Sequence, residues 1–142
     1  MPYFAIAISV MIASPGDVQP ERQTARDVIH EWNDTYAHQR VVLLPMGWES
    51  HSSPEMGDRP QAIINQQLLN QCDLLVAIFW TRLGTATGEA ASGTVEEITK
   101  HVAAGKPAMV YFSKSPIEPG RINREQYDAV LEYQAECRKN GL

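Results

Sequence analysis

Cysteine, clustered basic residues and long apolar segments are scarce in this sequence. Cys72 and Cys137 are its two cysteines, and neither belongs to a CxxC or Cys/His spacing, which disfavours a disulfide framework and a zinc site. Asp and Glu number 17 against 12 Lys and Arg, and the bases are scattered, which disfavours binding to nucleic acid or to an anionic membrane. The apolar opening "MPYFAIAISVMIASPGDV" lacks a basic start and is too short to cross a bilayer. We therefore expect a soluble, cytoplasmic protein.

Apolar runs alternate with segments of helical spacing along the whole chain. We expect strands over residues 4–13, 41–48, 72–80 and 107–113, and helices over 20–38, 61–71, 94–104 and 125–138. Such alternation implies right-handed crossovers between parallel strands. The sequence therefore predicts one flavodoxin-like, three-layer α/β domain over residues 1–142, with a parallel sheet of strand order 2-1-3-4.

Ligands of sheets of this type bind outside the carboxyl ends of the strands, near the point where the strand order reverses. Four segments should converge there, namely "ASPGD", "GWES", "WTRLG" and the start of the helix at Thr94. Backbone N–H groups of the first segment could meet a phosphate or ribose, a Trp could stack on a ring, and an Arg could bind a phosphate. Turn formation and packing are the alternatives for these residues. The candidate substrate-binding residues are Ser14, Gly16, Asp17, Trp48, Trp80, Arg82 and Thr94.

Metal and triad chemistry have little support in the sequence. The four histidines show no metal-ligand spacing and no partner pattern with Ser or Cys. We therefore expect no metal site, and only His51, in the long loop after the second strand, has a position that could serve a reaction.

Two adjacent carboxylates, Glu96 and Glu97, stand near the start of the third predicted helix. Thr94 and Glu97 have the spacing of a capping box, in which each side chain satisfies a backbone donor of the first turn. Glu96 stands four residues before Lys100 and could form an exposed helical pair worth about 0.3 kcal/mol. Glu97 borders the apolar stripe of this helix, and the helix start points at the predicted cleft. Glu97 is therefore either a cap or a carboxylate at the rim of a pocket.

The segment "SGTVEEITKHVAAGKPAMVYFS" resembles the Gly-Thr-x-x-Glu helix, Gly-Lys-Pro and strand of nucleoside 2-deoxyribosyltransferases. Its Glu-Ile pair also resembles the catalytic-glutamate helix of TIR domains of the bacterial antiphage-defence type. The resemblance extends more loosely over residues 4–113, including the "SPGD" loop. By this resemblance Gly93 and Thr94 take the Gly-Thr places, Glu97 takes the place of the catalytic glutamate, and Glu96 falls on a variable position.

Both families break an N-glycosidic bond at an anomeric carbon, through an oxocarbenium-like state that a carboxylate can stabilise or trap. Nicotinamide leaves NAD+ as a neutral molecule and requires no general acid, whereas an ordinary nucleoside base usually needs a proton. Asp17 and Glu49 are the possible acids, and neither is firmly placed by the sequence, so NAD+ is the favoured substrate.

The TIR resemblance implies an NAD+ glycohydrolase that releases nicotinamide and ADP-ribose or a cyclic form, with Glu97 as the catalytic residue and no bound cofactor. It also implies an effector of bacterial antiphage defence that assembles as a homo-oligomer and is fused to a C-terminal sensor domain. Two alternatives stay open. One is a nucleoside or nucleotide N-glycosidase or 2-deoxyribosyltransferase, and the other is a non-enzymatic TIR-type self-association module in which Glu97 is only a cap.

Overall fold

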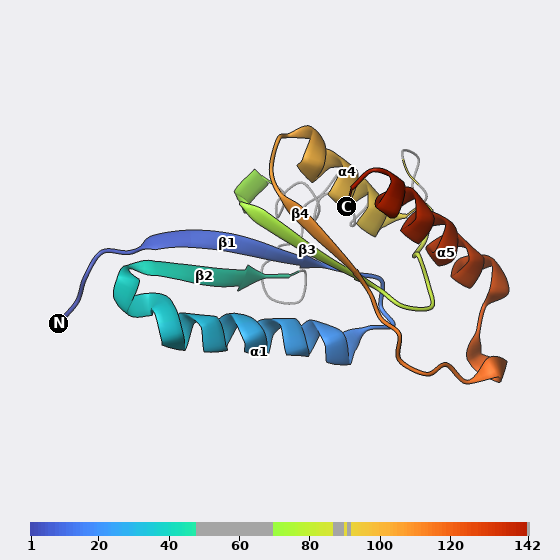
Figure 1. Ribbon diagram of the computed structural model, residues 1–142, viewed down its shortest axis with the longest axis horizontal. Coiled ribbons are helices and arrows are strands. Elements are labelled where there is room, and N and C mark those ends of the chain that lie inside the picture. The colour runs from blue at the N-terminus through green and yellow to red at the C-terminus, as the bar shows by residue number, and fades with distance from the viewer. Residues whose placement is uncertain (48–69, 87–89, 91, 142) are drawn as a thin grey trace, which may run out of the picture.

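A computed structural model of the chain describes residues 1–47, 70–86, 90 and 92–141. Its centre is a four-stranded sheet of order β2-β1-β3-β4, in which every neighbouring pair is parallel (Figure 1). This confirms the predicted α/β fold class and the strand order 2-1-3-4. The strands are β1 (Ile6–Ala13), β2 (Val41–Met46), β3 (Leu74–Phe79) and β4 (Ala108–Phe112).

Helices cover the sheet from both sides, with α1 on one face and α4 and α5 on the other (Figure 1). The chain steps from β1 to β2 in one direction and from β3 to β4 in the other, so right-handed crossovers place α1 and α4 on opposite faces. No helix in the described part of the chain is long and apolar enough to cross a membrane. The helices are α1 (Gln19–Tyr36), α4 (Gly93–Ala103) and α5 (Arg124–Lys139), with short 3-10 turns at η1 (Ala37–Gln39) and η2 (Pro119–Arg121).

All the predicted elements that fall within the described residues agree with the observed ones to within two residues at each end. The helix predicted over residues 61–71 lies outside the described residues, apart from its last two positions, which are helical.

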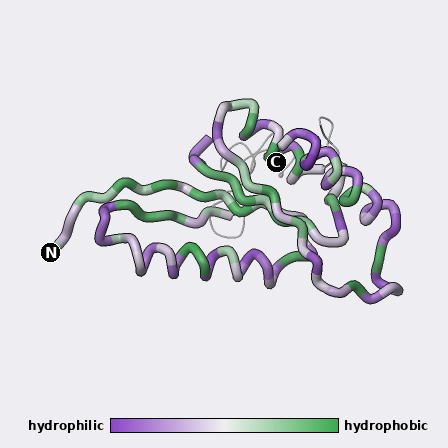
Figure 2. Tube along the Cα trace, viewed as in Figure 1, coloured by the Kyte–Doolittle hydropathy of each residue, from purple (hydrophilic) through white to green (hydrophobic). Residues whose placement is uncertain are grey.

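The strands read as continuous apolar runs because both faces of the sheet are covered. Along β1, Val10 and Ile12 face α1, whereas Met11 and Ala13 face α4 and α5, and all four are almost completely buried. Figure 2 shows the same pattern as apolar strands between helices of alternating hydropathy. On the α4 and α5 face, Phe79 packs against aromatic rings of β4 and α5 with ring centroids 5.5 and 5.4 Å away. This packing fixes the strand ends from which the loops of the site begin.

Side chains close two exposed positions of the sheet. Asn33 of α1 donates through Nδ2 to the Leu43 carbonyl and accepts from Leu43 N, both at 2.8 Å, so it satisfies the outer edge of β2. Pro45, which lacks an N–H, is tolerated in β2 because that strand is an edge. Asp73 lies at the amino end of β3, at the opposite end from the predicted cleft, where its Oδ2 accepts from Ser9 N at 2.9 Å.

Candidate functional site

Three of the four predicted segments meet at the carboxyl end of the sheet. Asp17, in the β1–α1 loop, accepts through Oδ2 from Thr81 Oγ1 at 2.7 Å and from Thr81 N at 3.0 Å. A Cβ placed on Gly84 would lie 3.2 Å from the Ser92 Cβ and 3.8 Å from the Pro15 Cγ. The β1–α1 loop, the β3–α4 loop and the start of α4 therefore converge, as the sequence predicted.

Three residues of the sequence analysis, in the fourth segment or directly after it, lie outside the described residues. These are the substrate-binding candidate Trp48, the possible acid Glu49 and the loop histidine His51.

A buried arginine of α1 supports the β1–α1 loop through hydrogen bonds. Arg22 is only 1% exposed, and its Nη1 donates to the Ile12 carbonyl at 2.9 Å and to Ser14 Oγ at 3.1 Å. A buried guanidinium is costly unless it is hydrogen-bonded, so these bonds fix the turn that follows β1. The sequence analysis missed Arg22, although its seven-residue spacing from Ile29 places both on the inner face of α1. Ser14 thus serves Arg22 as an acceptor, and Gly16 lies exposed at the turn.

The first turn of α4 is capped by Ser92. Its Oγ accepts from Val95 N at 3.1 Å, its backbone is extended, and α4 begins at Gly93. Thr94 is therefore inside the first turn, where its side chain is buried, and it is not the N-cap. The predicted capping box between Thr94 and Glu97 is wrong because an earlier serine already satisfies the orphan donor of the first turn.

Glu96 and Glu97 are both buried, at 3% and 5% exposure. Glu96 Oε1 accepts from Lys100 Nζ at 2.8 Å, so the predicted pair exists. Its predicted exposure is wrong, because only the Lys100 side chain reaches solvent. An amphipathic helix buries one stripe, whereas the start of α4 is buried on five consecutive residues, from Thr94 to Ile98. Burial therefore does not distinguish the two carboxylates.

Trp80 and Arg82 follow the end of β3 and differ in their surroundings. Trp80 packs with the α1-side cluster, opposite to its neighbour Phe79, and its Nε1 donates to the Ser115 carbonyl at 3.0 Å. Side chains of a strand alternate between faces, so Trp80 is not brought to Glu97, which lies on the α4 side. Arg82, two residues on, is exposed.

The turn around Arg82 has a further support that the sequence analysis missed. Gln126, in the first turn of α5, accepts through Oε1 from Leu83 N and from Gly84 N, both at 3.0 Å. No local pattern predicts this contact, because its partners are backbone groups some 40 residues away. Residues 80–84 are thus hydrogen-bonded to three other segments, through Asp17, Ser115 and Gln126.

A second polar cluster lies at the amino end of the sheet. His101 Nε2 lies 2.9 Å from the Pro107 carbonyl oxygen, which only accepts, so Nε2 carries the proton and Nδ1 accepts from the Cys72 thiol at 3.5 Å. Burial lowers the pKa of His101 and raises the pKa of Cys72, so both groups are held neutral. A buried neutral thiol is not a nucleophile, which makes this cluster structural.

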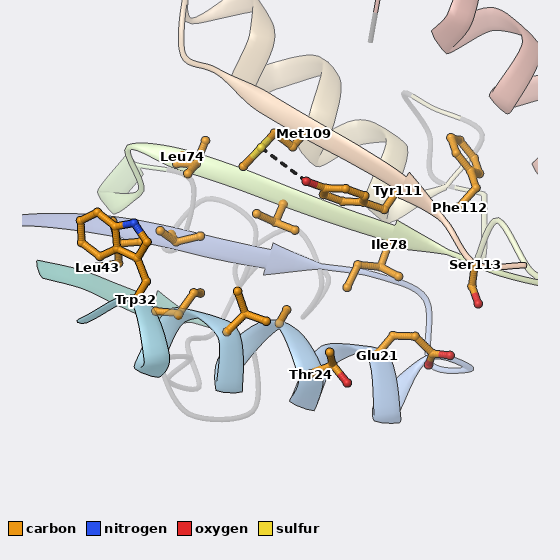
Figure 3. A pocket seen from close by; sticks show the side chains of 15 residues that line it. Glu21, Thr24, Trp32, Leu43, Leu74, Ile78, Met109, Tyr111, Phe112 and Ser113 are labelled. Atoms are coloured by element: carbon orange, nitrogen blue, oxygen red, sulfur yellow. Dashed lines mark hydrogen bonds between the residues drawn. The ribbon is translucent and has the colours of Figure 1, made fainter. Parts of the chain in front are cut away.

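An apolar groove of about 510 Å³ lies between α1 and the sheet, and residues of all four strands line it (Figure 3). Met109 and Tyr111 of β4 face it and stay partly exposed, as does Val28 of α1. The reason is that α1 alone covers this face among the described helices. Among the described residues that line it, Glu21 is the only charged one, so these residues supply no set of reacting groups.

The fold and its carboxyl edge define a parallel α/β domain with a buried carboxylate on α4 beside a braced loop that presents an exposed arginine. A family model described as "Domain of unknown function (DUF4062)" matches residues 9–141. The chain therefore belongs to the DUF4062 family. No curated protein matches the chain in a sequence comparison.

Proposed function

We propose that this chain is an NAD+ glycohydrolase domain of TIR-like type, which cleaves the bond between nicotinamide and ribose. In this proposal Glu97 stabilises the ribose cation that develops as neutral nicotinamide leaves. The products are nicotinamide and ADP-ribose or a cyclic form of it, and the protein uses NAD+ as a substrate with no bound cofactor.

The observation that carries the proposal is the burial of Glu97 in the first turns of α4, at the end of the helix that meets the converging loops. A carboxylate withdrawn from water interacts with a developing positive charge more strongly than an exposed one. Glu96, which pairs with Lys100 at 2.8 Å, is the poorer candidate because it falls on a variable position of the TIR and transferase resemblance. The resemblance of the Gly93, Thr94 and Glu97 spacing to TIR and transferase motifs supports the same residue.

The choice of NAD+ over an ordinary nucleoside rests on the leaving group. A nucleoside base needs a donated proton to leave, whereas nicotinamide does not. In this proposal Asp17 braces the site, because its Oδ2 accepts from the Thr81 amide and hydroxyl and so ties the β1–α1 loop to the turn after β3.

The wider role that we propose is that of a cytoplasmic effector in bacterial antiphage defence, in which depletion of NAD+ stops the infected cell. In this role the domain acts as a homo-oligomer under the control of a fused sensor domain. These parts of the proposal rest on the TIR resemblance alone.

The test is nicotinamide release from NAD+ by the purified domain at high protein concentration, with nucleosides as parallel substrates. We expect Glu97→Gln to lower the rate by at least about a hundredfold, and Glu96→Gln to retain most of it. Base release from nucleosides alone would instead assign the protein to the N-glycosidases or deoxyribosyltransferases. Silence on all substrates, also under forced oligomerisation, would favour the non-enzymatic self-association module.

A further inference from the structure

Three backbone donors of the turn after β3 are already occupied. Thr81 N is bound by Asp17, and Leu83 N and Gly84 N are both bound by Gln126. These three amides are therefore not available to bind an anion in the manner of a phosphate-binding loop. The exposed side chain of Arg82 is the other group of this turn that suits an anion.

Arg82 is the one residue of this turn with a cationic side chain, and its environment differs from that of its neighbours. Thr81 and Leu83 on either side of it are buried, whereas Arg82 is exposed. The backbone on both sides is tied down within one residue of Arg82, by Asp17 before it and by Gln126 after it. A group presented from a fixed backbone loses less conformational freedom on binding than one on a loose loop.

We propose that Gln126 is a positioning residue, which acts through Arg82, and that Arg82 binds the diphosphate of the substrate. The inference rests on the proposed function for its substrate class, because NAD+ carries a diphosphate and the guanidinium suits phosphate oxygens. Gln126 fits the role because its amide oxygen accepts both bonds without placing a negative charge beside the arginine.

The experiment measures calorimetric binding of ADP-ribose, which has the diphosphate but no nicotinamide bond, and of adenosine, which has no phosphate. We expect Arg82→Gln and Gln126→Ala each to weaken ADP-ribose binding about tenfold and to leave adenosine binding unchanged. The double variant should bind no more weakly than Arg82→Gln alone, because Gln126 acts through Arg82. Gln134→Ala, on the same helix, is the matched control and should bind as the wild type does.

A second readout shows that the substitution acts where we propose. Amide hydrogen exchange should speed up at Leu83 and Gly84 in Gln126→Ala and should stay slow at Thr81, which Asp17 still holds. If Gln126→Ala does not fold, Gln126→Met takes its place, since it keeps the volume and removes the acceptor.

Full additivity of the two substitutions, or unchanged ADP-ribose binding in Gln126→Ala, would overturn the inference. The failure of the proposed function looks different, because ADP-ribose binding would follow the expected pattern while no nicotinamide is released from NAD+.

Discussion

The two ends of the sheet both bury polar side chains, but they use them in opposite ways. At the amino end, the Cys72 thiol, the His101 ring and the Pro107 carbonyl satisfy one another in a closed chain, and Lys106 donates to the Cys72 carbonyl at 2.9 Å. At the carboxyl end, the polar groups bind loop backbones from distant segments and leave Arg82 exposed.

One helix serves both ends, which makes the comparison direct. Glu97 and His101 are four residues apart on α4 and therefore lie on the same side of that helix. His101 lies in the closed cluster, whereas Glu97 stands one helical turn nearer to the start of α4. The difference teaches that a buried polar residue is not a site by itself, and that the chemistry of a parallel sheet is sought at the carboxyl ends of its strands.

We expect the largest loss of stability at Gly84, which packs closely against α4, and a smaller loss at Gly105, which has open space around it. Gly84 and Gly105 both have positive φ, at 109° and 77°, but only the Cβ at Gly84 meets another atom within 4 Å. We expect Gly84→Ala to lower the unfolding free energy by about 2 to 4 kcal/mol, from strain and from contact with Ser92. Gly105→Ala at the amino end should cost only about 1 to 2 kcal/mol. Urea denaturation measures both, and equal losses would show that Gly84 is not held against α4.

The amino-end cluster should prove structural and not catalytic. His101→Leu leaves the Pro107 carbonyl and the Cys72 thiol without their partner, so we expect a loss of about 2 to 3 kcal/mol in unfolding free energy. Nicotinamide release per folded molecule should stay at the wild-type level. His30→Leu, at an exposed position of α1, is the control and should change stability little. Loss of activity without loss of stability in His101→Leu would move the site toward the amino end.

Acid should weaken this cluster before it affects the rest of the fold. Burial lowers the pKa of His101 below its ordinary 6.5, so the unfolded chain takes up a proton there that the folded chain does not. The contribution of the neutral His101 ring to the unfolding free energy is complete above pH 6.5. It is lost as the pH falls below that value toward the pKa of His101 in the folded protein. The stability difference between wild type and His101→Leu should therefore shrink on acidification to about pH 5. A difference that grows instead would contradict a neutral, buried imidazole.

The sequence predicts the fold well because the buried strands and the helix patterns are local properties of the chain. The convergence of "ASPGD", "WTRLG" and the start of α4 also follows, since the strand order decides which loops meet. The roles of Arg22 and Gln126 could not be predicted from local patterns, because each side chain binds backbone groups of another segment. The burial of Glu96 likewise depends on what packs around α4, which helical spacing does not reveal.

The start of α4 shows the same limit at one residue. Ser92 and Thr94 are both good N-cap residues, and the sequence analysis chose Thr94 because Glu97 follows it at the capping-box spacing. The choice is made by packing, since Gly84 sits against Ser92 and fixes where the helix begins.

The smallest predicted effect tests that choice. Ser92→Ala removes the acceptor of Val95 N, so we expect it to lower the unfolding free energy by about 1 kcal/mol. Thr94→Val removes a hydroxyl but keeps the side-chain shape, and it should cost only about a few tenths of a kcal/mol, because Thr94 does not cap the helix. Thermal denaturation of the two variants measures the difference. A larger loss in Thr94→Val than in Ser92→Ala would support the capping box after all. Glu97 would then have a purely structural role at the start of α4.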